Sequence, residues 1–235
     1  MFLVSAILDG LGSLAGPRAR HDLYLNRLMR WGKGEPEWRI LDQLVDSTRA
    51  AIDVGANQGL YAGSLSRLCP KVHAFEPIPW LAVALRRKVH SNVQVHNMAL
   101  SNRSGEAVLR IPIEDNCLTT IDDSNKFPTG LYVREVTTPI ARLDDVISEP
   151  VGFIKIDVEG HELAVLQGSL ETIRKNRPTL VVESEKNHNP VCPEAVFALL
   201  AGEGYSAFYL KDGIRHPAGA TPAPKGIVNY IFLPN

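Results

Sequence analysis

Cysteines are scarce in this sequence. Of the 235 residues only Cys69, Cys117 and Cys192 are cysteines. An odd number excludes a fully paired disulfide framework, and none of the separations matches the short spacing of a zinc site. We therefore expect free thiols in a reducing compartment and a cytoplasmic location.

The sequence also lacks an excess of charge of either sign. Its 25 Lys and Arg residues nearly balance its 26 Asp and Glu residues, which gives a formal net charge of -1. Proteins that grip the phosphate backbone of a nucleic acid usually carry a strongly basic face. The balance therefore gives no reason to expect nucleic acid as the main partner.

Long hydrophobic runs are missing as well. Residues 1–16 are apolar, but Asp9 interrupts them and no basic residue comes before them. This stretch is shorter than the ~20 apolar residues that a spanning helix needs, and it lacks the basic start of a signal peptide. We expect an amphipathic docking helix without stable membrane insertion; weak contact with a membrane surface is the alternative.

From residue 50 onward, short apolar runs alternate with helical patterns. The pattern predicts strands at 51–54, 72–75, 93–96, 153–156 and 180–182, and helices at 60–68, 81–89, 163–173 and 194–201. Two further strands, 205–210 and 227–233, are not separated by a helix. The alternation indicates an α/β fold with a doubly wound, mostly parallel sheet, and the last pair indicates a hairpin that adds an antiparallel strand.

Two segments do not follow this alternation. Residues 1–49 look mostly helical, and we expect an extension on the substrate side of the site that acts as a lid. Residues 101–140 contain β-type runs at 107–111 and 136–140 around a polar stretch at 114–129. A β-rich insertion with a long loop is the simplest account; the alternative is a loose surface excursion.

A glycine-containing turn follows the first predicted strand. Asp53 ends the apolar run, Gly55 and Gly59 follow, and an amphipathic segment begins directly afterwards. Glycines allow a sharp turn or a close approach to the backbone, whereas a carboxylate there would repel a pyrophosphate. The combination suits a cationic or hydroxyl-rich ligand such as S-adenosylmethionine (SAM). The alternative is a tight turn that binds nothing.

Acidic residues stand at the ends of the predicted strands. Ligands of open α/β sheets bind beyond these ends, which here carry Asp53, Glu76, Asn97, Asp157 and Glu183. Four carboxylates are too many for a phosphate site, and a buried unpaired carboxylate is costly. These residues therefore need a ligand, a cation or hydrogen-bond donors.

Glu76 has a second indication of function. It follows Asp53 by 23 residues, close to the spacing at which an acidic residue meets ribose hydroxyls in nucleoside-binding folds. A carboxylate accepts hydrogen bonds from both hydroxyls of a ribose. The alternative is an acid favoured at a helix N-terminus, with Pro77 just inside the helix.

A series of motifs follows in order over residues 50–185. They are DVGANQG at 53–59, FEP at 75–77, NMALSN at 97–102, RLDD at 142–145, IKIDVEGHE at 154–162 and VVESE at 181–185. Together they resemble the FkbM-type SAM-dependent methyltransferases. The resemblance implies a class I methyltransferase domain over residues 50–235, with a Rossmann-like, seven-stranded sheet. It also implies methyl transfer from SAM, which leaves S-adenosylhomocysteine (SAH).

The resemblance assigns roles to individual residues. The residues that would contact the cofactor are Asp53, Gly55, Ala56, Asn57, Gly59, Glu76, Pro77, Asn97, Met98, Ala99 and Asp157. Among them, the 53–59 turn would line the methionine end, Glu76 would hold the ribose, and 97–99 would border the adenine. The implied acceptor is a small molecule or glycan, through a hydroxyl of a sugar, glycolipid or polyketide.

A hydroxyl is a poor nucleophile unless a base accepts its proton. The candidate bases are Asp157, Glu159 and His161, and Asp157 is preferred because His161 also fits as an exposed residue in the first turn of a helix. Asp157, Glu159 and Glu183 could instead hold a divalent cation that polarises the acceptor oxygen. Their spacing permits this but does not require it.

Two other functions remain open. An NAD(P)-dependent oxidoreductase shares the strand-glycine-helix-acid arrangement, but the glycines here are spaced G-x-x-x-G and not G-x-G-x-x-G. A non-catalytic SAM- or glycan-binding module is the other alternative. The sequence is compatible with a homodimer. Candidate acceptor-facing residues outside the motifs are Tyr24, Trp31, Trp38, Tyr132 and Arg134.

Overall fold

The computed structural model describes residues 16–31, 35–113, 119–121, 132–184, 193–219, 224 and 226–235 of the chain. The predicted docking helix, most of the polar stretch at 114–129, Cys117 and Cys192 lie outside these residues, as does the side chain of Trp31. Cys69 is a buried free thiol. Within the described ranges, no helix is both long and apolar enough to cross a bilayer.

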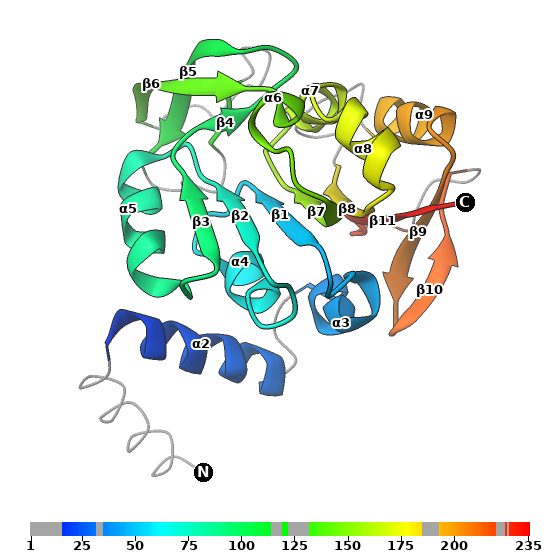
Figure 1. The fold of residues 1–235 in the computed structure, drawn as a ribbon, viewed down its shortest axis with the longest axis horizontal. Helices are drawn as coiled ribbons and strands as arrows, with labels where there is room; N and C mark the ends of the chain where they lie inside the picture. Colours follow the sequence, from blue (N-terminus) through cyan, green and yellow to red (C-terminus); the bar gives the residue numbers. More distant parts are fainter. Residues whose placement is uncertain are drawn as a thin grey trace.

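The central sheet has the strand order β10-β9-β11-β8-β7-β1-β2-β3 (Figure 1). Its strands are β1 (Ala50–Val54), β2 (Val72–Phe75), β3 (Val93–His96), β7 (Val151–Ile156), β8 (Thr179–Glu183), β9 (Tyr205–Lys211), β10 (Ile214–Pro217) and β11 (Asn229–Pro234). The five from β3 to β8 are parallel. β11 runs antiparallel between β8 and β9. The predicted α/β fold, with a mostly parallel sheet and an antiparallel strand from the C-terminal hairpin, is therefore confirmed.

The C-terminal hairpin contains one strand more than we predicted. β9 and β11 pair as expected, but β10 lies between them in the sequence and pairs with the outer edge of β9. Asp212 and Gly213 join β9 to β10, both with positive φ, as a tight two-residue hairpin turn requires. The described sheet therefore has eight strands rather than seven.

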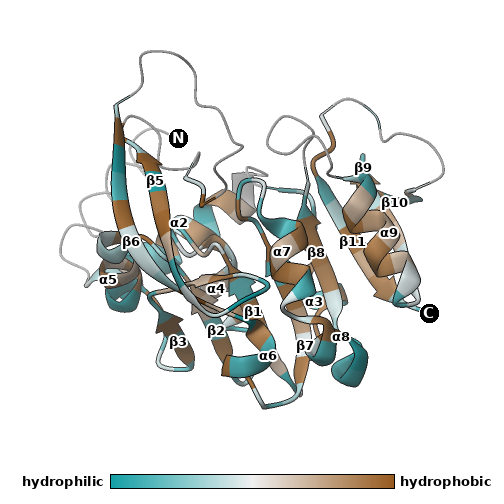
Figure 2. Cartoon of the chain, turned by 90° about the horizontal axis from the view of Figure 1, so that it is seen from above, coloured by the Kyte–Doolittle hydropathy of each residue, from teal (hydrophilic) through white to brown (hydrophobic). Residues whose placement is uncertain are grey.

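Both faces of the sheet are covered, which explains why its central strands are apolar throughout. All residues of β1 and β7 are buried, as is typical of parallel strands between two helical layers. One face packs on α6 (Leu143–Val146), α7 (Glu162–Gln167), α8 (Leu170–Asn176) and α9 (Glu194–Gly202). The other packs on α2 (Pro17–Trp31), η1 (Glu37–Ile40), α3 (Leu41–Leu44), α4 (Leu60–Leu65) and α5 (Pro79–Lys88). Figure 2 shows the hydrophobic residues gathered along the central strands.

A small second sheet occupies the crossover from β3 to β7. It consists of β4 (Ala99–Leu100), β6 (Val133–Ala141) and β5 (Gly105–Pro112), in that order. The β-type runs predicted at 107–111 and 136–140 fall in β5 and β6. Leu109 and Ile111 of β5 pack on Ile78, just before α5. This packing holds the small sheet against the carboxyl edge of the central sheet.

The helix α2 packs on α4 and α5. Leu25 is fully buried, and a Cβ on Gly63 of α4 would lie 2.7 Å from its Cδ1 atom. Arg18 Nε donates to the Val89 carbonyl at 2.9 Å, and His21 Nε2 lies 3.1 Å from the Gly59 carbonyl oxygen. The described part of residues 1–49 is therefore joined to the glycine turn through the α4 side of the sheet.

Candidate functional site

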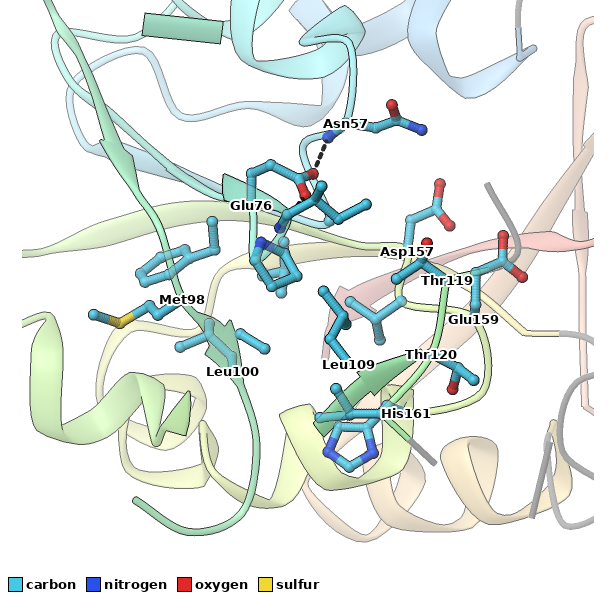
Figure 3. Close-up of a pocket in the computed structure, with 18 of the residues that line it drawn as sticks. Asn57, Glu76, Met98, Leu100, Leu109, Thr119, Thr120, Asp157, Glu159 and His161 are labelled. Carbon is cyan, nitrogen blue, oxygen red and sulfur yellow. Dashed lines mark hydrogen bonds between the residues drawn. The ribbon is translucent and has the colours of Figure 1, made fainter. Parts of the chain in front are cut away.

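A cavity of about 280 Å³ opens at the carboxyl ends of β1, β2, β7 and β8. Its lining includes nine predicted site residues, namely Gly55, Asn57, Glu76, Pro77, Met98, Ala99, Asp157, Glu159 and His161, and also Glu183. Figure 3 shows Met98 and Leu100 on one side of Glu76, and Asp157 and Glu159 on the other. The topology therefore gathers side chains that are more than a hundred residues apart in the sequence.

Four predicted cofactor residues do not line this cavity. They are Asp53, Ala56, Gly59 and Asn97. Asn97 Nδ2 donates to the carbonyls of Glu76 and Pro77, at 3.0 Å each, so it fixes the backbone after β2.

Sequence reasoning missed most of the apolar lining. The missed residues are Val54, Phe75, Ile78, Leu81, Leu100, Leu109, Thr119, Thr120, Ile121 and Val158. Most are hydrophobic, and in the sequence they look like any other core residues. Thr120 comes from the insertion and is placed by a backbone bridge to Arg110, which no local pattern indicates.

The two glycines after β1 are required by the packing of the chain itself. Gly55 has φ +83°, and a Cβ there would lie 1.8 Å from the carbonyl oxygen of Asp157. Gly59 has φ +84°, and its Cβ would lie 2.3 Å from Leu85 Cδ1. Both angles belong to the left-handed region that glycine adopts readily. The glycines therefore need no bound ligand to explain them, although Gly55 borders the cavity.

Two other residues of the lining also have left-handed backbone angles. Asn57 has φ 43° and Glu159 has φ 51°, and they occupy the loops after β1 and β7. Such angles are uncommon outside glycine, although asparagine tolerates them better than most residues. Strain of this kind gathers at functional sites, so it supports Glu159 as a residue placed for a purpose other than packing.

Glu76 joins the two loops that border one end of the cavity. Its Oε2 accepts from the Asn57 N–H at 2.7 Å (Figure 3), and its Oε1 accepts from the Ile78 N–H at 2.8 Å. Burial raises the pKa of this carboxyl to about 7, although both hydrogen bonds favour the charged form. Each oxygen has a second lone pair, so the carboxylate can still accept from a pair of hydroxyls.

Asp53 lies on the α4 face of β1 and is only 2% exposed. Burial raises its pKa to about 7; Lys155 and the Ala62 N–H oppose this shift, whereas Asp157 and Glu35 add to it. No donor among the described residues reaches its Oδ2 atom. A buried carboxylate oxygen without a partner is costly, so this side chain is suited to a cationic ligand.

Carboxylates gather at the other end of the cavity. Asp157 and Glu183 follow the paired strands β7 and β8, and both line the cavity with Glu159. Burial, together with the neighbouring charge of Asp157, raises the pKa of Glu183. Lys155, which is 1% exposed, places its Nζ 3.8 Å from Asp157 Oδ2. A proton can therefore be held at this end of the cavity.

The third candidate base, His161, lies apart from Asp157 and Glu159. His161 directly precedes α7, and its Nε2 is 2.9 Å from the Ser101 Oγ atom. Figure 3 places its ring away from Asp157. His161 therefore belongs to the cavity wall beside the insertion.

The described residues contain no group of three or more His, Cys, Asp or Glu side chains that could hold a metal ion.

The candidate acceptor-facing residues outside the motifs do not gather at one place. Trp38 is a core residue whose Nε1 donates to Ser64 Oγ at 2.5 Å. It therefore does not face the site of a methyl acceptor. The guanidinium of Arg134 lies 5.3 Å from the ring centre of Trp80. Tyr24 and Tyr132 are exposed.

Known proteins resemble this chain in both sequence and fold. "Methyltransferase 1" of Beauveria bassiana (strain ARSEF 2860) is 26% identical over 141 residues, which are 50% of this chain and 57% of that protein. The crystal structure of the methyltransferase FkbM from Methylobacillus flagellatus KT matches with a TM-score of 0.51 at 18% identity, over 80% of this chain and 44% of that one. This chain thus spans less than two thirds of either relative.

The family match has a wider reach. Residues 53–207 match the methyltransferase FkbM domain, and this range contains every cofactor-contacting and catalytic residue predicted above. It covers more than half of the chain. The chain therefore belongs to the FkbM family of SAM-dependent methyltransferases.

Proposed function

We propose that the protein transfers a methyl group from SAM to a hydroxyl of a small molecule or glycan: a sugar, a glycolipid or a polyketide-type compound. The observation that supports this most directly is the layout of the cavity, with Glu76 at one end and Asp157, Glu159 and Glu183 at the other. The first end suits a ribose, and the second suits an acceptor that loses a proton. Membership of the family favours this function over a nicotinamide-dependent oxidoreductase.

The residues present fit SAM. Asp53 Oδ2 has no donor among the described residues, which suits the positively charged end of this cofactor. Each carboxylate oxygen of Glu76 has a second lone pair that can accept from a ribose hydroxyl. Phe75, Met98 and Leu100 supply an apolar wall where a flat base can be buried. When bound, SAM supplies a methyl group on a sulfonium, which is a good leaving group.

The chain itself must bind the methyl acceptor, orient it and accept its proton. The apolar insertion residues Leu109 and Ile121 border the cavity and would help to exclude water from it. Asp157 is the preferred base because it stands at the strand end next to Glu183 and Lys155, whereas His161 is engaged with Ser101. Glu159 then orients the acceptor.

A screen for transfer of an isotopically labelled methyl group tests the proposal. Purified protein is incubated with labelled SAM and with nucleotide sugars, glycolipid precursors or hydroxylated polyketides. Asp157→Asn should abolish transfer while SAH affinity stays within a few-fold of the wild-type value. Transfer that survives in this variant would exclude Asp157 as the base. SAH binding without transfer to any acceptor would favour the non-catalytic module instead.

Three further expectations accompany the proposal. A cytoplasmic location rests on the scarce cysteines, and the absence of a nucleic-acid partner rests on the balanced charge. A homodimer is allowed but not required, and sedimentation of the purified protein decides it.

A further inference from the structure

A cluster of charged side chains lies directly behind the cavity, and residues of the N-terminal extension belong to it. Lys155, Asp53 and Glu37 are buried, whereas the side chain of Glu35 is partly exposed. Glu35 Oε2 accepts from the Tyr61 hydroxyl at 2.6 Å and lies 3.6 Å from Lys155 Nζ. Glu37, at the start of η1, is 2% exposed. Asp53 completes the cluster. Lys155 connects it to the cavity, because its Nζ is also 3.8 Å from Asp157, which lines the cavity wall.

Negative charge exceeds positive charge in this cluster. Lys155 is the one cation that acts on Asp53, Glu37 and Glu183 alike among the described residues. Its other polar partner is the neutral Asn229, which accepts at 2.7 Å. A single buried lysine cannot neutralise the two buried carboxylates of Asp53 and Glu37, and a buried carboxylate without compensation is costly.

Two carboxylate oxygens of the cluster receive no hydrogen bond from the part of the chain that the structure describes. Besides Asp53 Oδ2, the Glu37 Oε2 atom is buried and no described residue donates to it. The charges of Glu35 and Lys155 both act on Glu37, as they do on Asp53, so both side chains lie within the range of the same two charges. Burial also raises the pKa of Glu37. Two unpartnered acceptors from separate segments indicate a missing cationic donor.

We propose that Glu35 and Glu37 form, together with Asp53, the part of the cofactor site that takes the ammonium group of SAM. The segment 35–38 then closes the methionine end of the cofactor. This inference rests on the proposed SAM binding. It assigns a role to residues outside the family match, which begins at residue 53, and it places this segment on the cofactor side and not over the acceptor.

Two nucleoside probes separate the ammonium contact from the rest of the site. SAH carries the ammonium group, whereas 5′-methylthioadenosine has the same adenosine and a thioether but no amino acid. Calorimetric titration of the full chain should show that Glu37→Gln weakens SAH binding about tenfold, the size of one charge-assisted hydrogen bond. Affinity for 5′-methylthioadenosine should stay within twofold. Asp42→Asn, an exposed acid of the same extension, should change neither.

Each other outcome counts against the inference. Unchanged SAH affinity would show that Glu37 does not contact the ammonium group, and an equal loss for both probes would make Glu37 a structural residue. Unchanged SAH affinity with a raised acceptor KM would make the segment an acceptor lid. If Glu37→Gln does not fold, Glu35→Gln serves for the same comparison, because its amide oxygen still accepts from Tyr61. A wild-type chain that binds no SAH would overturn the proposed function itself, which is a separate result.

Discussion

At the scale of single residues, the glycines can be ranked by what their missing Cβ would meet. Gly55 faces a backbone carbonyl, Gly59 faces the flexible end of Leu85, and Gly213 faces open space, all three at positive φ. Alanine at Gly213 should cost about 1 kcal/mol from backbone strain alone. Alanine at Gly59 should cost roughly 1–2 kcal/mol, and at Gly55 roughly 3 kcal/mol or more. Urea unfolding measures the three costs, and a different order would contradict this account of the glycine turn.

Glu76 offers a second test at this scale. Glutamine there keeps one acceptor oxygen but turns an amide N–H₂ toward the N–H of Asn57 or Ile78, both of which now donate to the carboxylate. A buried donor facing a donor costs about 1–3 kcal/mol. Glu76→Gln should weaken SAH and 5′-methylthioadenosine alike by roughly tenfold, because both carry the ribose. Exposed Glu106→Gln is the control, and a loss confined to SAH would place Glu76 elsewhere along the cofactor.

At the scale of elements, α2 should behave as part of the core. Leu25 is fully buried against Gly63 of α4, so Leu25→Ala should lower the free energy of unfolding by roughly 2–4 kcal/mol. Met29, half exposed on the same helix, should change it by less than about 0.5 kcal/mol when replaced by alanine. Thermal unfolding compares the two variants. Equal, small effects would show that α2 is only loosely attached.

The elements also show where sequence reasoning reaches its limit. Parallel strands were predictable because burial on both faces makes them continuously apolar. The predicted helix at 163–173 is instead two helices, α7 and α8. Its break falls at Gly168, where a Cβ would lie 2.0 Å from the Ser101 carbonyl, a contact with a distant segment. β10 has no apolar run, and only the Asp212-Gly213 pair signals its hairpin turn.

At the scale of the whole molecule, the polar part of the site was more predictable than its walls. The carboxyl ends of parallel strands meet at one edge, so Glu76, Asp157 and Glu183 had to come together. Gly55 and Gly59 correctly marked the turn beside the cavity, although the packing of the chain itself also requires them. The contribution of Glu35 and Glu37 could not be predicted, because it depends on how the extension folds back over α4.

The buried acids make the stability of the ligand-free protein depend on pH. The pKa of Asp53 is 3.8 when unperturbed and about 7 in the fold. Between these values the folded chain holds a proton that the unfolded chain has lost. The contribution of Asp53 is therefore fully present below about pH 4 and disappears as pH rises through about 7. Glu76, with a folded pKa of about 7, acts in the same direction. The partly buried His96, whose pKa falls to about 4, opposes it.

A comparison with Asp53→Asn isolates one group from this sum. The charged groups that act on Asp53 are Lys155, Asp157 and Glu35, and the variant keeps all three. From pH 5 to pH 8 its free energy of unfolding should rise relative to wild type by roughly 2–3 kcal/mol, as measured by urea unfolding at each pH. Parallel pH curves would show that Asp53 does not titrate in this range. Saturating SAH should flatten the wild-type curve relative to the variant, because a bound ammonium holds the Asp53 carboxyl in its charged form.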